Sequence, residues 1–152
     1  MPTWFTADTH FGHAAARALY RRPFPSLAAM DDAIASYWNQ VVAPVDTVYH
    51  LSDFAVRQHA PGPLLARLHG AKHLITGNNN PPAIIALPGW ASTQPYLELA
   101  IDGTFLVLCH YALRTWNNMS RGALNLRAHS HGRLQPSPVD MTSAWMHARS
   151  GR

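Results

Sequence analysis

Residues 2–8 read Pro2-Thr3-Trp4-Phe5-Thr6-Ala7-Asp8, an apolar and β-branched run that ends at an aspartate. This pattern predicts a buried strand over residues 2–7. A similar run at residues 47–51 predicts a second strand, and an aspartate, Asp53, again follows it. Helical patterns separate these strands, and the alternation is typical of an α/β fold.

Three helices are expected, at residues 14–20, 27–42 and 63–68. Ser26 is placed to cap the second helix, whose apolar side chains, Tyr37 and Trp38 among them, recur at helical spacing and should form its core face. The dipeptide Asp102-Gly103 predicts a hairpin turn. Further strands are expected at residues 72–75, 96–101, 104–109 and 124–127. We therefore expect a single α/β domain over residues 1–152, with a mixed sheet or two.

The composition indicates a globular protein. Hydrophobic residues make up 47% of the 152 residues and charged residues only 13%, a ratio unlike that of disordered chains. No apolar run reaches the roughly 18 residues that a membrane span needs. The only cysteine, Cys109, excludes an internal disulfide. Without a signal-type segment, we expect a cytoplasmic protein.

The formal net charge of +4 favours anionic partners. Phosphate esters and nucleic acids both qualify. The arginines are scattered rather than clustered, which favours a small phosphate-ester substrate over a nucleic acid.

Side chains that can bind a metal follow five of the predicted strands. In α/β sheets, ligands bind beyond the carboxyl ends of strands, so these side chains should converge. Any one of the histidines could be an ordinary residue, Asp53 a helix cap and Asn78 a turn residue after Gly77. A single metal centre explains all seven positions, whereas the alternative needs a separate ordinary role for each residue. The seven residues are Asp8, His10, Asp53, Asn78, His110, His129 and His131.

These residue types suit a site for two divalent ions. Two ions about 3.5–4 Å apart can clamp the attacking and leaving oxygens of a phosphoryl displacement. A carboxylate such as Asp53 can bridge them. Imidazole ligands favour Mn, Fe, Co, Ni or Zn over Mg or Ca. Water bound to such a metal ionises near neutral pH, and a metal-bridging hydroxide could attack the phosphorus.

The order of these motifs resembles that of the calcineurin-like metallophosphoesterase superfamily, whose pattern is D-x-H, G-D, G-N-H-[DE], a lone H, and G-H-x-H. Asp8-Thr9-His10-Phe11-Gly12-His13 matches the opening of a small bacterial and phage branch, and Arg22-Pro23-Phe24 is also similar to that branch. The resemblance implies a four-layer α/β/β/α sandwich with the dimetal site at the strand ends. One metal would be bound by Asp8, His10, Asp53 and His131, and the other by Asp53, Asn78, His110 and His129.

The chain departs from this pattern at several positions. Ser52 and Ala128 replace glycines, so some backbone strain is expected. Asn79 and Asn80 replace the histidine and the acid of G-N-H-[DE]. An amide cannot donate a proton to a leaving group near neutral pH, although Asn79 could still bind phosphate.

Two further expectations rest on the same comparison. His13 is a candidate to bind phosphate or replace the proton donor, or else it caps the following helix. The tail after Gln135 lacks a recognisable strand to close the second sheet.

The sequence thus favours a metal-dependent phosphoesterase that prefers phosphodiesters or activated esters to alkyl monoesters. Two alternatives stay open. One is a catalytically weakened metal-binding relative, and the other is a nucleic-acid-processing enzyme of the same fold.

Overall fold

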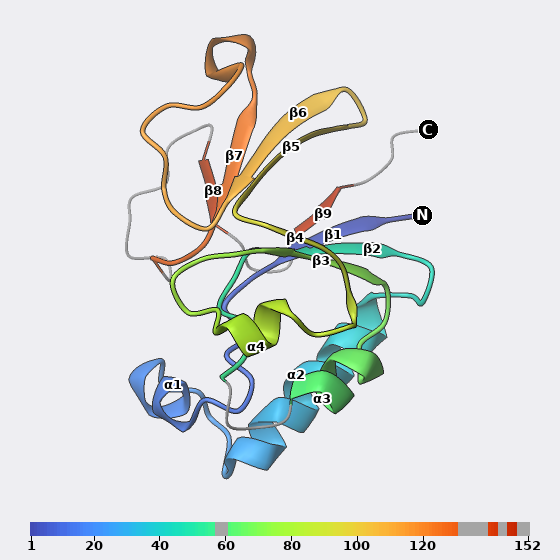
Figure 1. Cartoon of the computed structure of the whole chain (residues 1–152), viewed down its shortest axis with the longest axis vertical. Coiled ribbons are helices and arrows are strands. Elements are labelled where there is room, and N and C mark those ends of the chain that lie inside the picture. Colours follow the sequence, from blue (N-terminus) through green and yellow to red (C-terminus); the bar gives the residue numbers. More distant parts are fainter. Residues whose placement is uncertain (57–60, 131–139, 143–145, 149–152) are drawn as a thin grey trace.

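The computed structural model describes residues 1–56, 61–130, 140–142 and 146–148. In this part of the chain, four α-helices lie on one side of a five-stranded sheet, and a four-stranded sheet lies on its other side (Figure 1). The helices are α1 (Ala14–Leu19), α2 (Leu27–Val41), α3 (Pro61–Arg67) and α4 (Pro82–Ile85). The strands are β1 (Thr3–Thr6), β2 (Thr47–His50), β3 (Ala71–Ile75), β4 (Trp90–Gln94), β5 (Tyr96–Ile101), β6 (Thr104–Cys109), β7 (Leu124–Arg127), β8 (Asp140–Thr142) and β9 (Met146–Ala148).

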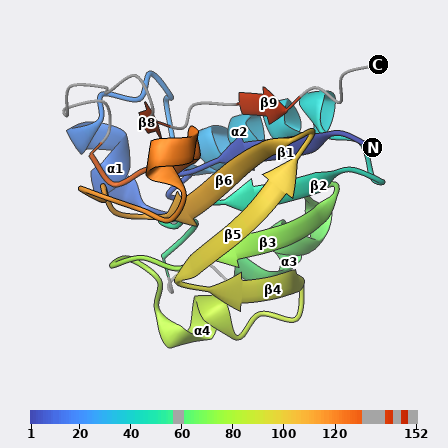
Figure 2. The ribbon, with the colours of Figure 1, turned by 90° about the horizontal axis from the view of Figure 1, so that it is seen from above.

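The first sheet has the order β4-β3-β2-β1-β9, in which β1 to β4 are parallel and β9 pairs antiparallel with β1. The second has the order β5-β6-β7-β8, with an antiparallel hairpin of β5 and β6 followed by parallel pairs. Seen from above, β5 and β6 run across the first sheet (Figure 2). The α/β prediction is therefore confirmed.

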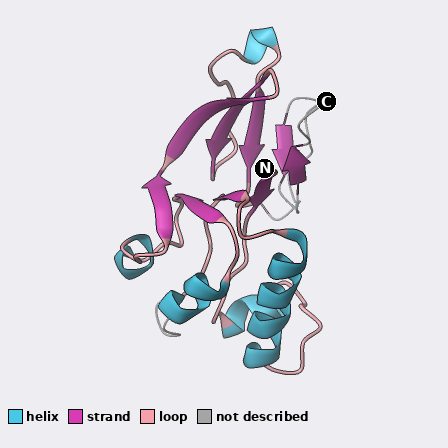
Figure 3. Ribbon diagram, turned by 90° about the vertical axis from the view of Figure 1, so that its right-hand side faces the viewer, coloured by secondary structure: helices cyan, strands magenta, loops and turns pink. Residues whose placement is uncertain are grey.

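The described residues form three layers: helices, first sheet and second sheet (Figure 3). The resemblance implied a fourth layer of helices outside the second sheet. The described part of the chain has no α-helix there, and a short 3-10 turn at Met119–Arg121 joins β6 to β7.

Alternate side chains of the first sheet enter two separate cores. Val48 faces the helices, whereas Tyr49 beside it faces the second sheet. The core between helices and sheet includes Phe11, Trp38, Val48, Phe54, Leu65, Leu74 and Ile84. The core between the sheets includes Phe5, Leu51, Ile75, Leu106, Leu108 and Leu126. This double burial explains why β1 to β3 are short runs with few charged residues.

Most predicted elements are confirmed within two residues, and β5, β6 and β7 have the predicted bounds. The Ser26 hydroxyl accepts a hydrogen bond from the Ala29 amide, as an N-cap should. The assignment of Tyr37 to the core face is wrong, because its side chain is 57% exposed.

The expectation that the tail lacks a closing strand is also wrong. Strand β8 pairs with β7 in the second sheet, and β9 pairs with β1 in the first. Three-residue strands leave too little sequence pattern to be recognised. Among the described helices, none is long and apolar enough to cross a membrane.

Candidate functional site

The predicted ligands lie just beyond the carboxyl ends of the central strands. Strands β1 and β2 are parallel neighbours, so the turns that follow them leave the sheet side by side. Backbone hydrogen bonds join the two turns, from the Asp8 amide to the Ser52 carbonyl (3.1 Å) and from the His10 amide to the Asp53 carbonyl (2.9 Å). The strand pairing thus continues into the site and brings Asp8, His10 and Asp53 together.

These three side chains form a first ligand group. One potential ligand atom from each lies within 4.8 Å of those of the other two. His10 and Asp53 are each only 3% exposed. Burial, and then the charge of Asp53, raise the pKa of Asp8 to about 7, although Arg22 acts in the opposite direction. Two carboxylates held together away from water favour a bound cation, because it offsets both burial and repulsion.

A second ligand group lies on the other side of Asp53. The Nε2 atom of His110 is 2.9 Å from Oδ1 of Asn78 and 3.2 Å from Nδ1 of His129. Nδ1 of His129 is also 3.2 Å from Oδ1 of Asn78. Asn78 follows β3, His110 follows β6, and His129 lies two residues beyond β7, so residues from both sheets meet here.

Within this second group, the tautomer of His110 is fixed. Nδ1 of His110 lies 2.9 Å from the Leu51 carbonyl, which can only accept, so this nitrogen carries the proton. Burial lowers the pKa of His110, which keeps its ring neutral and leaves Nε2 as a lone pair. That lone pair, Nδ1 of His129 and the side-chain amide of Asn78 converge within 3.2 Å of one another. Acceptors that converge in this way fit a cation.

Asp53 lies between the two groups. Its Oδ2 is 3.8 Å from Nε2 of His10, and its Oδ1 is 3.8 Å from Nε2 of His110. Two ligands of one transition-metal ion, each bound at about 2.1 Å, lie roughly 3 to 4 Å apart. Each oxygen of Asp53 is therefore spaced to share an ion with a different histidine.

Several of these residues adopt a left-handed backbone conformation, which is rare outside glycine. Ser52 has a φ of 74°, so the expectation of strain at this position is confirmed. The expectation of strain at Ala128 is wrong. The left-handed residue there is its neighbour His129, with a φ of 62°. Such strain collects at functional sites. Asp8, His10 and Asp53 are left-handed as well, with φ values of 54°, 51° and 55°.

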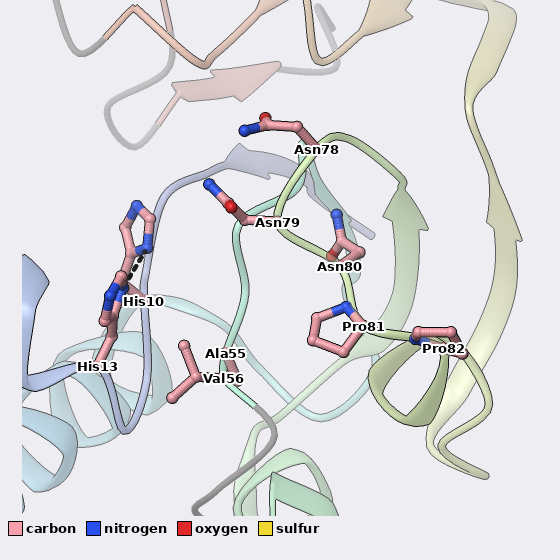
Figure 4. Close-up of a pocket in the computed structure, with 9 residues that line it drawn as sticks. All are labelled: His10, His13, Ala55, Val56, Asn78, Asn79, Asn80, Pro81 and Pro82. Atoms are coloured by element: carbon pink, nitrogen blue, oxygen red, sulfur yellow. Dashed lines mark hydrogen bonds between the residues drawn. The ribbon is translucent and has the colours of Figure 1, made fainter.

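A cleft of about 390 Å³ adjoins the first ligand group. Figure 4 shows His10 and His13 on one side and the asparagines on the other. Nδ1 of His13 is 3.3 Å from Nδ1 of His10. His13 stands at the N-cap position of α1, but its side chain makes no capping hydrogen bond. The alternative that its side chain caps the helix is therefore wrong. The remaining lining residues are Ala55, Val56, Asn78, Asn79, Asn80, Pro81 and Pro82.

Of the seven predicted ligands, the structure brings six together, and His131 lies outside the described residues. Sequence reasoning missed the residues that support the ligands. The Arg22 guanidinium donates to the carbonyls of Asp8 and Thr9, at 2.6 Å each. The Asp31 carboxylate accepts from the Gly12 amide. Both lie well apart in sequence from what they support. Arg22 stands in the Arg22-Pro23-Phe24 motif that resembles the branch, but the motif does not show which groups the guanidinium contacts.

Comparisons with known proteins give the following. No protein-family model matches the chain. It is 32% identical over 80 residues to an uncharacterized protein of Methanocaldococcus jannaschii, an alignment that covers 51% of this chain and 46% of that protein. It is 35% identical over 85 residues to the gene 66 protein of Mycobacterium phage L5, covering 53% and 40%. The chain therefore matches less than half the length of either relative.

Two solved structures share the fold. A protein of unknown function from Aquifex aeolicus superposes with a TM-score of 0.66 at 23% identity, covering 86% of this chain and 78% of that one. A novel archaeal phosphodiesterase superposes with a TM-score of 0.54 at 15% identity, covering 93% and 81%. The chain thus has the fold of a known phosphodiesterase and carries a cluster of residues, Asp8, His10 and Asp53, that could hold a metal.

Proposed function

We propose that this protein is a metal-dependent phosphoesterase of the calcineurin-like superfamily, acting on phosphodiesters or activated phosphate esters. One observation carries the proposal: Asp53 lies between two groups of potential ligands, with a histidine nitrogen 3.8 Å from each of its oxygens. The fold shared with an archaeal phosphodiesterase supports it. The order of the motifs, which resembles that of the small bacterial and phage branch, also supports the proposal.

The donor set fits two divalent ions such as Mn, Fe, Co, Ni or Zn. Asp8, His10 and Asp53, together with His131, would hold one ion. Asp53, Asn78, His110 and His129 would hold the other. When bound, two such ions supply positive charge for the phosphoryl oxygens and an ionised water as nucleophile.

The residues around the cleft would bind and orient the ester. His13 and Asn79 both line it and can donate hydrogen bonds to phosphoryl oxygens. Asn79 already donates from Nδ2 to Oδ2 of Asp53, at 3.2 Å. The Asn79 amide can donate a hydrogen bond but cannot transfer a proton to the departing oxygen. Leaving groups that are stable as anions would therefore be favoured. We therefore propose diesters or activated esters as substrates rather than alkyl monoesters.

The proposal is tested by returning Mn²⁺, Ni²⁺, Zn²⁺ or Fe²⁺ to metal-stripped protein and measuring hydrolysis of bis(p-nitrophenyl) phosphate and of alkyl monoesters. We expect metal-dependent turnover of the diester, lost in Asp53→Ala along with most bound metal. Asp32→Ala is the matched control, because Asp32 is 68% exposed and bonded to Arg67 on the surface. Full metal content in Asp53→Ala would contradict the bridging role.

The same experiment addresses a second candidate, a metal-binding relative with little catalysis. The observation in its favour is that the neighbouring residues Asn79 and Asn80 are both amides, unable to act as acids. Two bound metals per chain without turnover of either ester class would support this candidate.

A further inference from the structure

The carboxylate of Asp53 receives a side-chain hydrogen bond on each oxygen. Nδ2 of Asn79 donates to Oδ2 at 3.2 Å, and the hydroxyl of Ser52 donates to Oδ1, also at 3.2 Å. Ser52 is itself bonded, because Nδ2 of Asn80 donates to its hydroxyl oxygen. A chain of two hydrogen bonds therefore runs from Asn80 through Ser52 to Asp53.

Hydrogen-bond chemistry fixes the direction of this chain. An ionised carboxylate only accepts, so the single proton of the Ser52 hydroxyl must point to Asp53. The serine oxygen is then free to accept from Asn80. If the Asn80 amide were reversed, its oxygen would compete with Asp53 for the same proton. In the observed orientation Oδ1 of Asn80 is buried and has no hydrogen-bond partner among the described residues, so the amide keeps its donor on Ser52 at the expense of its own acceptor.

This arrangement limits rotation of the Asp53 carboxylate. The terminal torsion of an aspartate is soft, and an unsupported carboxylate turns over a broad range. Each oxygen of Asp53 has one donor and one histidine nitrogen near it, His10 on the side of Oδ2 and His110 on the side of Oδ1. With the donors in place, one lone pair on each oxygen stays directed toward its own ligand group.

We propose that Ser52 and Asn80 are a pair of positioning residues that orient Asp53 as the ligand shared by both metals. This inference rests on the proposed function, and it adds that the two residues act as one unit. Hydrogen bonds of this kind to metal ligands are worth about 10- to 100-fold in metal affinity.

The test is a Co²⁺ titration of the metal-stripped full-length chain, followed by visible absorption. Ser52→Ala keeps a Cβ at the left-handed φ of 74° and removes only the hydroxyl. Asn80→Ala removes the donor to that hydroxyl. We expect each to weaken Co²⁺ binding about 10-fold and to alter the absorption band. The double variant should be no weaker than the worse single one, since both changes break the same chain.

Asn80→Leu separates hydrogen bonding from packing. Leucine has nearly the shape of asparagine but has no group that can donate to the Ser52 hydroxyl, and it adds no charge beside the ligand groups. We expect it to weaken Co²⁺ binding about as much as Asn80→Ala. Retained affinity in Asn80→Leu would mean that Asn80 only fills space, and would overturn the proposal.

Ser92→Ala is the matched control. The Ser92 hydroxyl lies 2.7 Å from Nδ1 of His73, in strand β4 and outside both ligand groups, so Co²⁺ affinity should not change. Two results would contradict the positioning role of Ser52 and Asn80 without contradicting the proposed function. One is equal Co²⁺ affinity of Ser52→Ala, Asn80→Ala and the unaltered chain, and the other is additive losses in the double variant. Failure of the unaltered chain to bind Co²⁺ would instead contradict the proposed function.

Discussion

Gly77 occupies a position with no room for a side chain. A Cβ there would lie 2.3 and 2.4 Å from Cδ2 and Cγ of His110, and 2.4 Å from the Ser52 hydroxyl. His110 is fully buried and held by the Leu51 carbonyl, so it cannot move aside. We expect Gly77→Ala to displace His110, lower the metal content and reduce the free energy of unfolding by about 2 kcal/mol, as overpacking commonly does.

Metal analysis and urea unfolding measure both effects. Gly62→Ala is the matched control, because its Cβ would meet only Cδ2 of Leu87, at an ordinary 3.6 Å. In helix α3 that change should be neutral or slightly stabilising. Unchanged metal content in Gly77→Ala would show that His110 is not confined as described.

Asn79 should make the rate sensitive to the leaving group of the ester. If no side chain donates a proton, the rate should fall steeply as the pKa of the leaving group rises. Asn79→His adds an ionisable group to the cleft beside Asp53. We expect a flatter dependence on leaving-group pKa, with alkyl esters gaining on the order of 100-fold and aryl esters little.

Rates for a series of aryl and alkyl esters test this. An equal gain for all of them would show that proton donation is not what the site lacks.

The candidate metal ligands could be predicted from the sequence because each follows closely after a predicted strand. The carboxyl ends of parallel strands lie at the same edge of a sheet. The sequence did not predict the bond between Asn80 and Ser52. The two residues are 28 positions apart, and only the adjacency of the turns after β2 and β3 brings them together.

At the scale of elements, Arg22 holds the turn that carries Asp8 and His10. One guanidinium group donates to two successive carbonyls, and this fork geometry has no equivalent in lysine or glutamine. We expect Arg22→Gln to loosen the turn and weaken metal binding by the first ligand group about 10-fold, while the second ligand group is less affected.

Stepwise Co²⁺ binding constants measure this difference. Arg67→Gln is the control, because Arg67 is 58% exposed and its ion pair with Asp32 contributes little. Equal weakening of both binding steps would argue for a general loss of structure rather than a local clamp.

Two elements in the middle of the chain were not predicted, for physical reasons. Helix α4 has only four residues, too few to show a helical period. Strand β4 lies at the edge of the first sheet, and its side chains Trp90-Ala91-Ser92-Thr93-Gln94 alternate between half-buried and exposed. An edge strand needs no continuous apolar run, so no pattern of residues predicted β4.

At the scale of the whole molecule, the two cores meet at the sheet that carries the site. The sequence predicted strands with both faces buried, and the helices that cover one face. Only the resemblance to the superfamily implied that a second sheet covers the other face. The pattern of the chain itself did not predict it, because Leu106 and Leu108 of β6 enter the same core as Phe5 of β1 from far along the chain. The proposed metal ligands that follow strands of the two sheets therefore come together only when both sheets are in place.

His50 should make the stability of the protein depend on pH in mild acid. This histidine is fully buried, its ring stacks at 14° to that of Trp38, and its Nε2 lies 3.0 Å from the Thr9 hydroxyl. That hydroxyl donates to the Phe54 carbonyl, so it accepts from His50. Burial lowers the pKa of His50 from 6.5 to about 3, although Asp53 opposes the shift and His10 and His110 add to it.

A lowered pKa means that the unfolded chain takes up the proton first. The stability that His50 contributes is complete above pH 6.5 and falls as the pH drops toward 3, by about 2 kcal/mol at pH 5. His50→Gln keeps a donor for Thr9 but does not titrate. Urea unfolding of metal-stripped protein at pH 7.5 and pH 5 should therefore show the unaltered chain losing about 2 kcal/mol more than the variant. Effects of pH that do not involve residue 50 are common to both proteins and cancel in this difference. Equal losses would mean that His50 is protonated in the folded protein, which its surroundings of Trp38, Phe54 and the Thr9 hydroxyl oppose.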